Sequence, residues 1–193
     1  FITMDFESHT LQNGIRVIHK RSDSPVAHCS IMINAGTRDE LDNEHGIAHF
    51  IEHVVFKGTK KRKAYHIMSR MEDVGGELNA YTTKEETVIH ATFLKDDFDR
   101  AVELIADITF RSTFPEKEIK KEKEIVIDEI NSYKDNPSEL IFDEYEELIY
   151  EGHPFGLNIL GSKRDIKRFT RSDIQRFIER NYKVYYKPNT RES

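Results

Sequence analysis

The chain has 193 residues, enough for one large domain or two small ones with a well-formed core. Its net charge of −6 does not suggest nucleic-acid binding, and no apolar run approaches the length of a membrane span. The single cysteine, Cys29, excludes both an internal disulfide and a cysteine metal site. It fits a reducing compartment, so we expect a cytoplasmic location.

The first half of the chain predicts strands with two helices between them. Asn13-Gly14 favours a type I′ turn, and alternating apolar and polar residues predict the strand that follows. Gly58 and the pair Gly75-Gly76 are typical of helix ends. The expected elements are a hairpin over 10–20, a strand over 26–34, helices over 45–56 and 63–73, and strands over 78–82 and 87–93.

From residue 96 onward the pattern becomes helical. The predicted helix starts are Asp96-Asp97, Pro115, Asn136-Pro137 and Thr170, the last in a T-x-x-D capping pattern. We expect helices over 97–110, 115–135, 137–149 and from 170, with a loop over 152–161 and a strand beginning at 183–187. Strands followed by helices predict an α+β fold, in which helices pack on a mostly antiparallel sheet.

The helix predicted over 45–56 carries the most informative motif, H-x-x-E-H, formed by His49, Glu52 and His53. Because an α-helix turns by about 100° per residue, the two imidazoles lie one turn apart with Glu52 on the same face. Such a pair can bind one Zn²⁺, and the carboxylate beside it can accept a proton from water. The alternative is an ordinary helix whose histidines have other partners. The surrounding residues are apolar almost all round, which predicts burial and therefore a need for partners.

A zinc site of this kind needs a third protein ligand, and the helix predicted over 115–135 offers two candidates. Glu122 and Glu129 flank its apolar stripe, roughly 20° apart on the helical wheel and about two turns apart along the axis. Either could instead be a salt-bridged residue at the edge of the core. An axial separation of about 10 Å means that both cannot bind one ion directly, and the pattern alone does not choose between them.

The same residues and several others resemble a known family, the inverzincin peptidases that include pitrilysin, insulin-degrading enzyme and the mitochondrial processing peptidase. The resemblance covers nearly the whole chain. It rests on residues 11–17, 36–40, 46–53, 56–59, 75–80 and 122–131. H-x-x-E-H together with Gly-Gly-x-x-Asn-Ala and a glutamate some 75 residues downstream is highly specific.

This resemblance implies a zinc peptidase that hydrolyses peptide bonds. It makes Glu129 the third ligand of one Zn²⁺ and gives Glu122 a supporting role behind the ligands. Glu52 would take a proton from the metal-activated water and return it to the leaving amine. By the same likeness, a substrate peptide would add as a strand beside Asn79 and Ala80.

The resemblance also implies that residues 1–193 form a single N-terminal domain, the catalytic half of a longer enzyme, and that the last strand of its sheet is missing from this chain. Relatives of this kind have a second homologous half, as a domain or a subunit, that completes the binding of a peptide or unfolded protein substrate. We therefore expect the chain to bind zinc and to cleave peptides only weakly by itself.

Two other classes of protein share parts of this pattern. A non-catalytic scaffold or partner subunit of the same fold would not need the retained His49, Glu52, His53 and Glu129. An enzyme like S-ribosylhomocysteine lyase also has H-x-x-E-H, but it uses a catalytic cysteine, and Cys29 is not in the matching context. The sequence therefore favours the peptidase.

Overall fold

The computed structural model describes residues 6–183, and it confirms the predicted α+β class. Its strands are β1 (Glu7–Thr10), β2 (Arg16–His19), β3 (Val26–Ile33), β4 (Glu77–Thr82) and β5 (Thr87–Leu94). Its helices are α1 (Ile47–Val54), α2 (Ala64–Glu72), α3 (Phe98–Arg111), α4 (Glu116–Lys134), α5 (Pro137–Ile149), α6 (Lys163–Arg168) and α7 (Arg171–Asn181). Within the described residues, no helix is long and apolar enough to cross a membrane.

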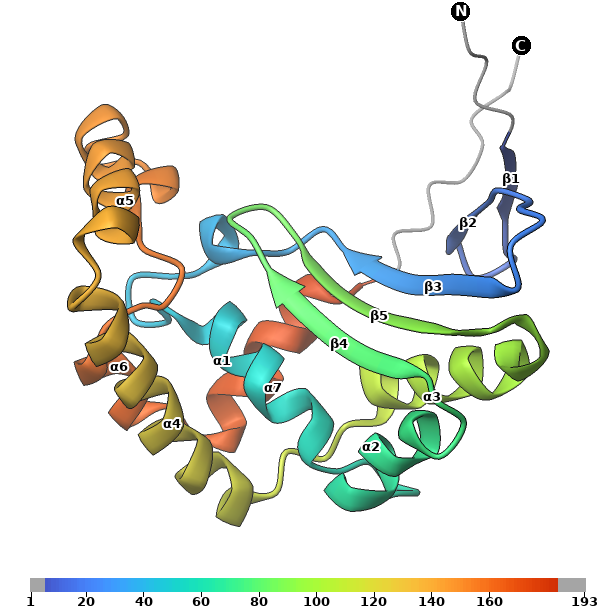
Figure 1. The fold of residues 1–193 in the computed structure, drawn as a ribbon. Coiled ribbons are helices and arrows are strands. Elements are labelled where there is room, and N and C mark those ends of the chain that lie inside the picture. Colours follow the sequence, from blue (N-terminus) through green and yellow to red (C-terminus); the bar gives the residue numbers. More distant parts are fainter. Residues whose placement is uncertain (1–5, 184–193) are drawn as a thin grey trace, which may run out of the picture.

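The main sheet is antiparallel with the order β3-β5-β4, so β4 is an edge strand among the described residues. Side chains of β5 alternate, and Ile89, Ala91 and Phe93 enter a core shared with α2 and α3. Figure 1 shows these two helices below the sheet, whereas no described helix covers its other face. The strand expected at 183–187 falls almost entirely outside the described residues.

The hairpin β1–β2 forms, but its turn is not the expected type I′ turn. That turn needs a positive φ at both Asn13 and Gly14, and only Gly14 has one (89°). The Gly14 N–H donates to the Leu11 carbonyl at 2.9 Å, and the Leu11 N–H donates to Ile15 at 2.8 Å. The connection is therefore the three-residue form, a turn followed by a left-handed glycine.

The helix starts were predicted well, although not every cap works as expected. Thr170 and Asp173 form the predicted capping box at α7. Asp97 precedes α3, but its side chain makes no capping hydrogen bond and instead pairs with Arg100 at 3.3 Å. The loop expected over 152–161 contains a short 3₁₀ turn and leads into α6, which the sequence reading missed.

Helix α1 lies in the middle of the second core, where α4, α6, α7 and the sheet surround it. Its start is fixed by Glu40, whose two carboxylate oxygens accept the Gly46 and Ala48 N–H groups at 2.9 Å each. Gly46 has a φ of 91°, and a Cβ there would lie 2.8 Å from the Gly161 Cα. Only glycine fits at this crossing, which holds the helix carrying the motif in a defined place.

Candidate metal centre

The centre forms where α4 crosses α1. Val126 and Ile130 of α4 are buried in the same core as the apolar residues of α1. Because residues 126, 129 and 130 share one side of α4, this packing carries Glu129 toward the histidines of α1. The core contacts therefore position the charged residues at its edge.

The structure brings His49, His53 and Glu129 together around one point. The two Nε2 atoms lie 3.2 Å apart, and Glu129 Oε2 lies 3.2 Å from His53 Nε2. Glu129 Oε1 lies 3.7 Å from His49 Nε2. Ligands about 2.0–2.1 Å from a tetrahedral zinc ion are roughly 3.3–3.4 Å from one another, so these spacings suit zinc. No other group of three metal-ligating side chains converges in this way within residues 6–183.

The charges of the site keep its donor atoms available. Burial, together with the charge of His53, lowers the pKa of His49 to about 4, although Glu129 opposes this shift. Burial also works against protonation of His53, but the hydrogen bond and charge of Glu129, with Glu52 and Glu122, raise its pKa above the usual value. The hydrogen bond from His53 in turn lowers the pKa of Glu129. At neutral pH, His49 therefore presents a lone pair and Glu129 a carboxylate.

Glu122 does not join the ligand group but lies behind it. Its Oε2 faces His53 Nδ1 at 3.6 Å, and its Oε1 lies 2.9 Å from Lys57 Nζ. Its side chain is only 6% exposed, so its charge depends on these partners. The two predicted glutamates thus occupy different sides of the His53 ring. His49 has no such partner, because its Nδ1 is buried without a hydrogen bond among the described residues.

Glu52 lies on the same face of α1 as the two histidines and remains partly accessible. Burial raises the pKa of its carboxyl, while Thr82 at the end of β4 and the nearby His53 oppose that shift. A carboxyl with a raised pKa is suited to exchanging protons near neutral pH. Because Glu52 of α1 lies next to Thr82, the end of the edge strand β4 lies beside the centre.

Asn79 and Ala80 both lie on β4, opposite His90 and Ile89 of β5. The side chain of Asn79 is exposed and Ala80 is buried. The Ala80 N–H donates to the carboxamide oxygen of its neighbour Asn79 at 2.9 Å. This backbone group is therefore already hydrogen-bonded within the free chain.

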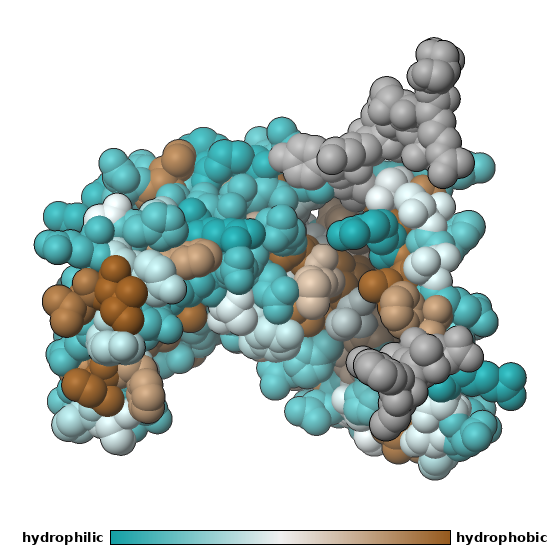
Figure 2. Space-filling view, turned by 90° about the horizontal axis from the view of Figure 1, so that it is seen from above, coloured by the Kyte–Doolittle hydropathy of each residue, from teal (hydrophilic) through white to brown (hydrophobic). Residues whose placement is uncertain are grey.

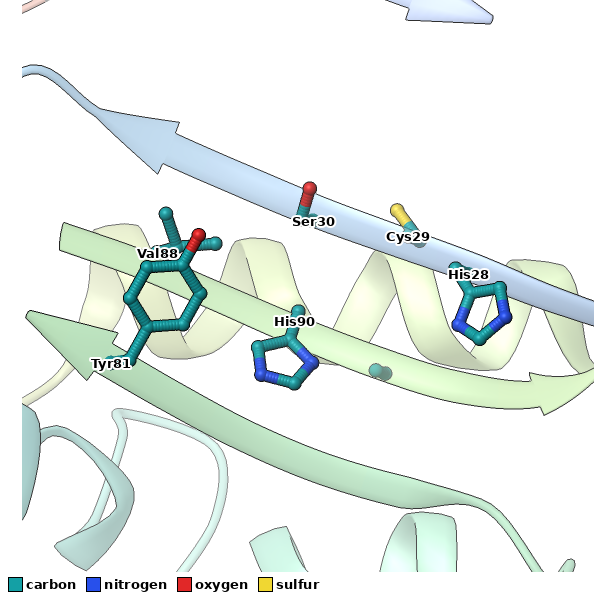
Figure 3. A pocket seen from close by; sticks show the side chains of 7 residues that line it. His28, Cys29, Ser30, Tyr81, Val88 and His90 are labelled. Atoms are coloured by element: carbon teal, nitrogen blue, oxygen red, sulfur yellow. The ribbon is translucent and has the colours of Figure 1, made fainter. Parts of the chain in front are cut away.

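A hollow of about 250 Å³ lies on the sheet, and none of the predicted site residues lines it. Figure 3 shows the rings of His28, Tyr81 and His90 over three neighbouring strands, with His28 Nδ1 3.0 Å from Thr92 Oγ1. Among residues 6–183, His28 and His90 belong to no group of three metal-ligating side chains. The metal centre is recognised from converging donor atoms rather than from a cavity.

Sequence reasoning missed Lys57 as a neighbour of the centre. A signal was present, because Lys57 follows His53 by four residues and so falls on the same side of the continuing helical turn. Lysine at the end of a helix is common, however, since it balances the partial charge of the last carbonyls. The contact with Glu122 becomes visible only when α4 is placed.

An inverted H-x-x-E-H helix whose imidazoles meet a glutamate from a second helix, on this α+β fold, is the arrangement of an inverzincin metallopeptidase domain. Residues 16–163 match the family described as Insulinase (Peptidase family M16). The chain therefore belongs to peptidase family M16.

Three similar proteins show how far the likeness extends. The chain is 39% identical over 175 residues to "Mitochondrial-processing peptidase subunit beta" of Bos taurus, covering 90% of this chain and 35% of that protein. It is 35% identical over 179 residues to a Rickettsia felis protein named "Uncharacterized zinc protease", covering 92% and 43%. A crystal structure of a protease from Helicobacter pylori matches with a TM-score of 0.88 and 27% identity, covering 93% and 44%. The chain thus spans less than half the length of each.

Proposed function

We propose that this chain is the zinc-binding half of a peptidase that hydrolyses peptide bonds with one Zn²⁺ and an activated water molecule. The observation that carries the proposal is the convergence of two imidazole nitrogens and a carboxylate at 3.2–3.7 Å from one another. Three protein ligands with a fourth position left for water or substrate is the usual composition of a catalytic zinc site. The relatives whose names include zinc protease and processing peptidase support the same assignment.

In this proposal His49, His53 and Glu129 hold the ion, whose Lewis acidity would polarise the scissile carbonyl and ease the ionisation of water. Glu52 accepts the proton of the attacking water and returns it to the leaving amine. Its raised pKa suits both steps, because a group that titrates nearer to neutrality can give back what it takes.

The edge strand β4 is the proposed binding site for the substrate backbone, with Asn79 and Ala80 in contact with the peptide. An unpaired edge can hydrogen-bond an added strand with little dependence on its side chains. The Ala80 N–H is bonded to Asn79 Oδ1 in the free chain, so a peptide that uses this donor displaces the Asn79 carboxamide. Asn79 would then be free to bond the peptide.

Zinc affinity is expected to rise with pH through the neutral range. Zinc displaces the proton held by His53, whose pKa is raised, whereas His49 has already lost its proton above about pH 4. Below the His53 pKa the dissociation constant should therefore change by about tenfold per pH unit, and above it the dependence should flatten. Competition with a chromophoric chelator between pH 5.5 and 8.5 measures this, and a flat profile below pH 6.5, the ordinary histidine pKa, would contradict it.

The partner proposed for this domain is a second homologous half, and α5 offers it a surface. Ile141, Phe142, Tyr145, Leu148 and Ile149 form an apolar stripe on α5. Their exposed fractions lie between 53% and 75%, and no residue of the helix is buried. Figure 2 shows apolar side chains gathered at the end of the molecule that α5 forms (left). A contiguous stripe of this kind marks an interaction surface.

The negative charge around α5 indicates what kind of partner surface would fit it. Residues 135–162 contain seven acidic residues and no lysine or arginine, which leaves carboxylates on both sides of the stripe. The partner surface should therefore be an apolar groove bordered by basic residues. A second domain is favoured over a loose peptide because the relatives are more than twice as long as the region matched here.

Peptide hydrolysis tests the proposal directly. The chain alone should bind one zinc per molecule but turn over a fluorogenic peptide about a hundredfold more slowly than the proposed longer enzyme with its second half (the native enzyme), because that half would supply part of the substrate clamp. Elemental analysis and steady-state kinetics measure the two properties. Absence of bound zinc would overturn the metal assignment, and equal turnover would overturn the need for a second half.

A companion measurement locates the partner surface. Amide hydrogen exchange within residues 137–150 should be slower in the native enzyme than in the chain alone, whereas residues of α2 around the equally exposed Tyr65 should exchange alike in both. Equal exchange of α5 in the two samples would contradict the docking surface.

A further inference from the structure

We propose that Lys57 is a positioning residue of the metal centre, which anchors Glu122 so that Glu122 orients the imidazole of His53. The inference rests on the zinc site proposed above and adds a residue to it. It concerns a contact network that ties the end of the ligand helix α1 to the ligand helix α4.

The geometry places Glu122 between the two groups, with one oxygen for each. Oε1 lies 2.9 Å from Lys57 Nζ, a charged hydrogen bond of ordinary length. Oε2 lies 3.6 Å from His53 Nδ1, on the opposite side of the ring from the nitrogen that faces Glu129. A small rotation of the ring or the carboxylate closes this gap to a hydrogen bond. The Nδ1–H of His53 then has an acceptor, and Nε2 keeps its lone pair for the metal.

Burial makes the lysine necessary. The Glu122 side chain is 6% exposed, and an unpaired carboxylate at that depth is strongly disfavoured. Lys57 is the one cation other than His53 that pairs with it among residues 6–183. Without the ammonium group, the Glu122 carboxylate would turn toward water, and it would no longer fix the orientation of the His53 ring.

The simpler alternative is that Lys57 only stabilises the end of a helix, because it ends the 3₁₀ turn Val55–Lys57 that extends α1. A cation there balances the partial negative charge of the last carbonyls. That role affects stability but not the metal, so the two roles differ in what they predict for the bound ion. A readout at the metal separates them.

The first test compares Lys57→Met and Lys57→Arg with the wild-type chain. Lys57→Met should weaken zinc binding by about 10- to 100-fold, the usual effect of removing a group that orients a ligand. It should also shift the visible absorption bands of the Co²⁺-loaded protein, which report the ligand field. Lys57→Arg keeps the charge and should restore both properties. The matched control is Lys61→Met, since the Lys61 side chain is exposed and, among residues 6–183, its ammonium group pairs only with Glu103, at 3.5 Å.

A double-mutant cycle with Glu122→Gln keeps the inference falsifiable even where Lys57→Met also affects folding. If Lys57 acts through Glu122, then Lys57→Met should change zinc affinity little once Glu122 is already Gln. Losses that add in the double variant would overturn the inference, as would an unchanged Co²⁺ spectrum in Lys57→Met. A wild-type chain that binds no zinc would instead refute the proposed function, so the two failures are distinguishable.

Discussion

Replacing Glu52 with Gln in the native enzyme should lower kcat for peptide hydrolysis by about a thousandfold while zinc stays bound, because a general base contributes on the order of 10²–10⁴ to such a reaction. This expectation follows because the proposed metal ligands and the proposed general base are different residues. The donor atoms that converge belong to His49, His53 and Glu129, and Glu52 is not among them. Its carboxyl has a raised pKa and lies on the same face of α1 as the two histidines, the side on which the proposed zinc ion and its water would bind.

Glutamine is nearly isosteric with glutamate but cannot accept a proton, so the substitution removes the chemistry with little change in packing. Elemental analysis should therefore find one zinc in both proteins. Glu124→Gln on the exposed side of α4 is the matched control and should keep full activity. Loss of metal together with activity in Glu52→Gln would instead indicate that Glu52 is a ligand.

Helical periodicity predicted only part of the arrangement of the centre. The helical wheel places Glu122 and Glu129 on one side of α4 and excludes direct binding of one ion by both, but it does not say which glutamate joins the two histidines. That choice depends on where α4 crosses α1, which the contacts of Val126 and Ile130 decide. In the structure Glu129 faces both Nε2 atoms and Glu122 faces Nδ1 of His53. The resemblance to a family supplied the assignment that local pattern lacked.

Other features were out of reach for a physical reason. The type I′ prediction failed because Asn-Gly is compatible with several short turns, and strand pairing selects among them. The sequence predicted the helix α5 from its apolar pattern. Such a pattern indicates that one face of a helix is covered, but it does not identify the surface that covers it. Lys57 contacts Glu122 across 65 positions of sequence, and single-sequence reasoning has no access to such pairs.

Replacing Glu129 with Gln should weaken zinc binding by more than about a hundredfold, since even groups that only orient a ligand are worth 10- to 100-fold. The neutral amide is a poor zinc ligand and removes the one negative charge within the ligand group. His49→Ala should have an effect of similar size, because it removes a buried donor whose lone pair is free at neutral pH.

Two control substitutions make the same kind of chemical change at positions outside the centre. Asp128→Asn alters the exposed neighbour of Glu129 on α4, and His28→Ala removes an exposed histidine on the sheet. Both should bind zinc like the wild type in a chelator competition assay. The ligand variants should retain the folded core, because its apolar residues, Val126 and Ile130 among them, are untouched. Zinc affinity that survives in Glu129→Gln would mean that α4 contributes packing rather than a ligand, and the centre would then need a third donor from elsewhere in the enzyme.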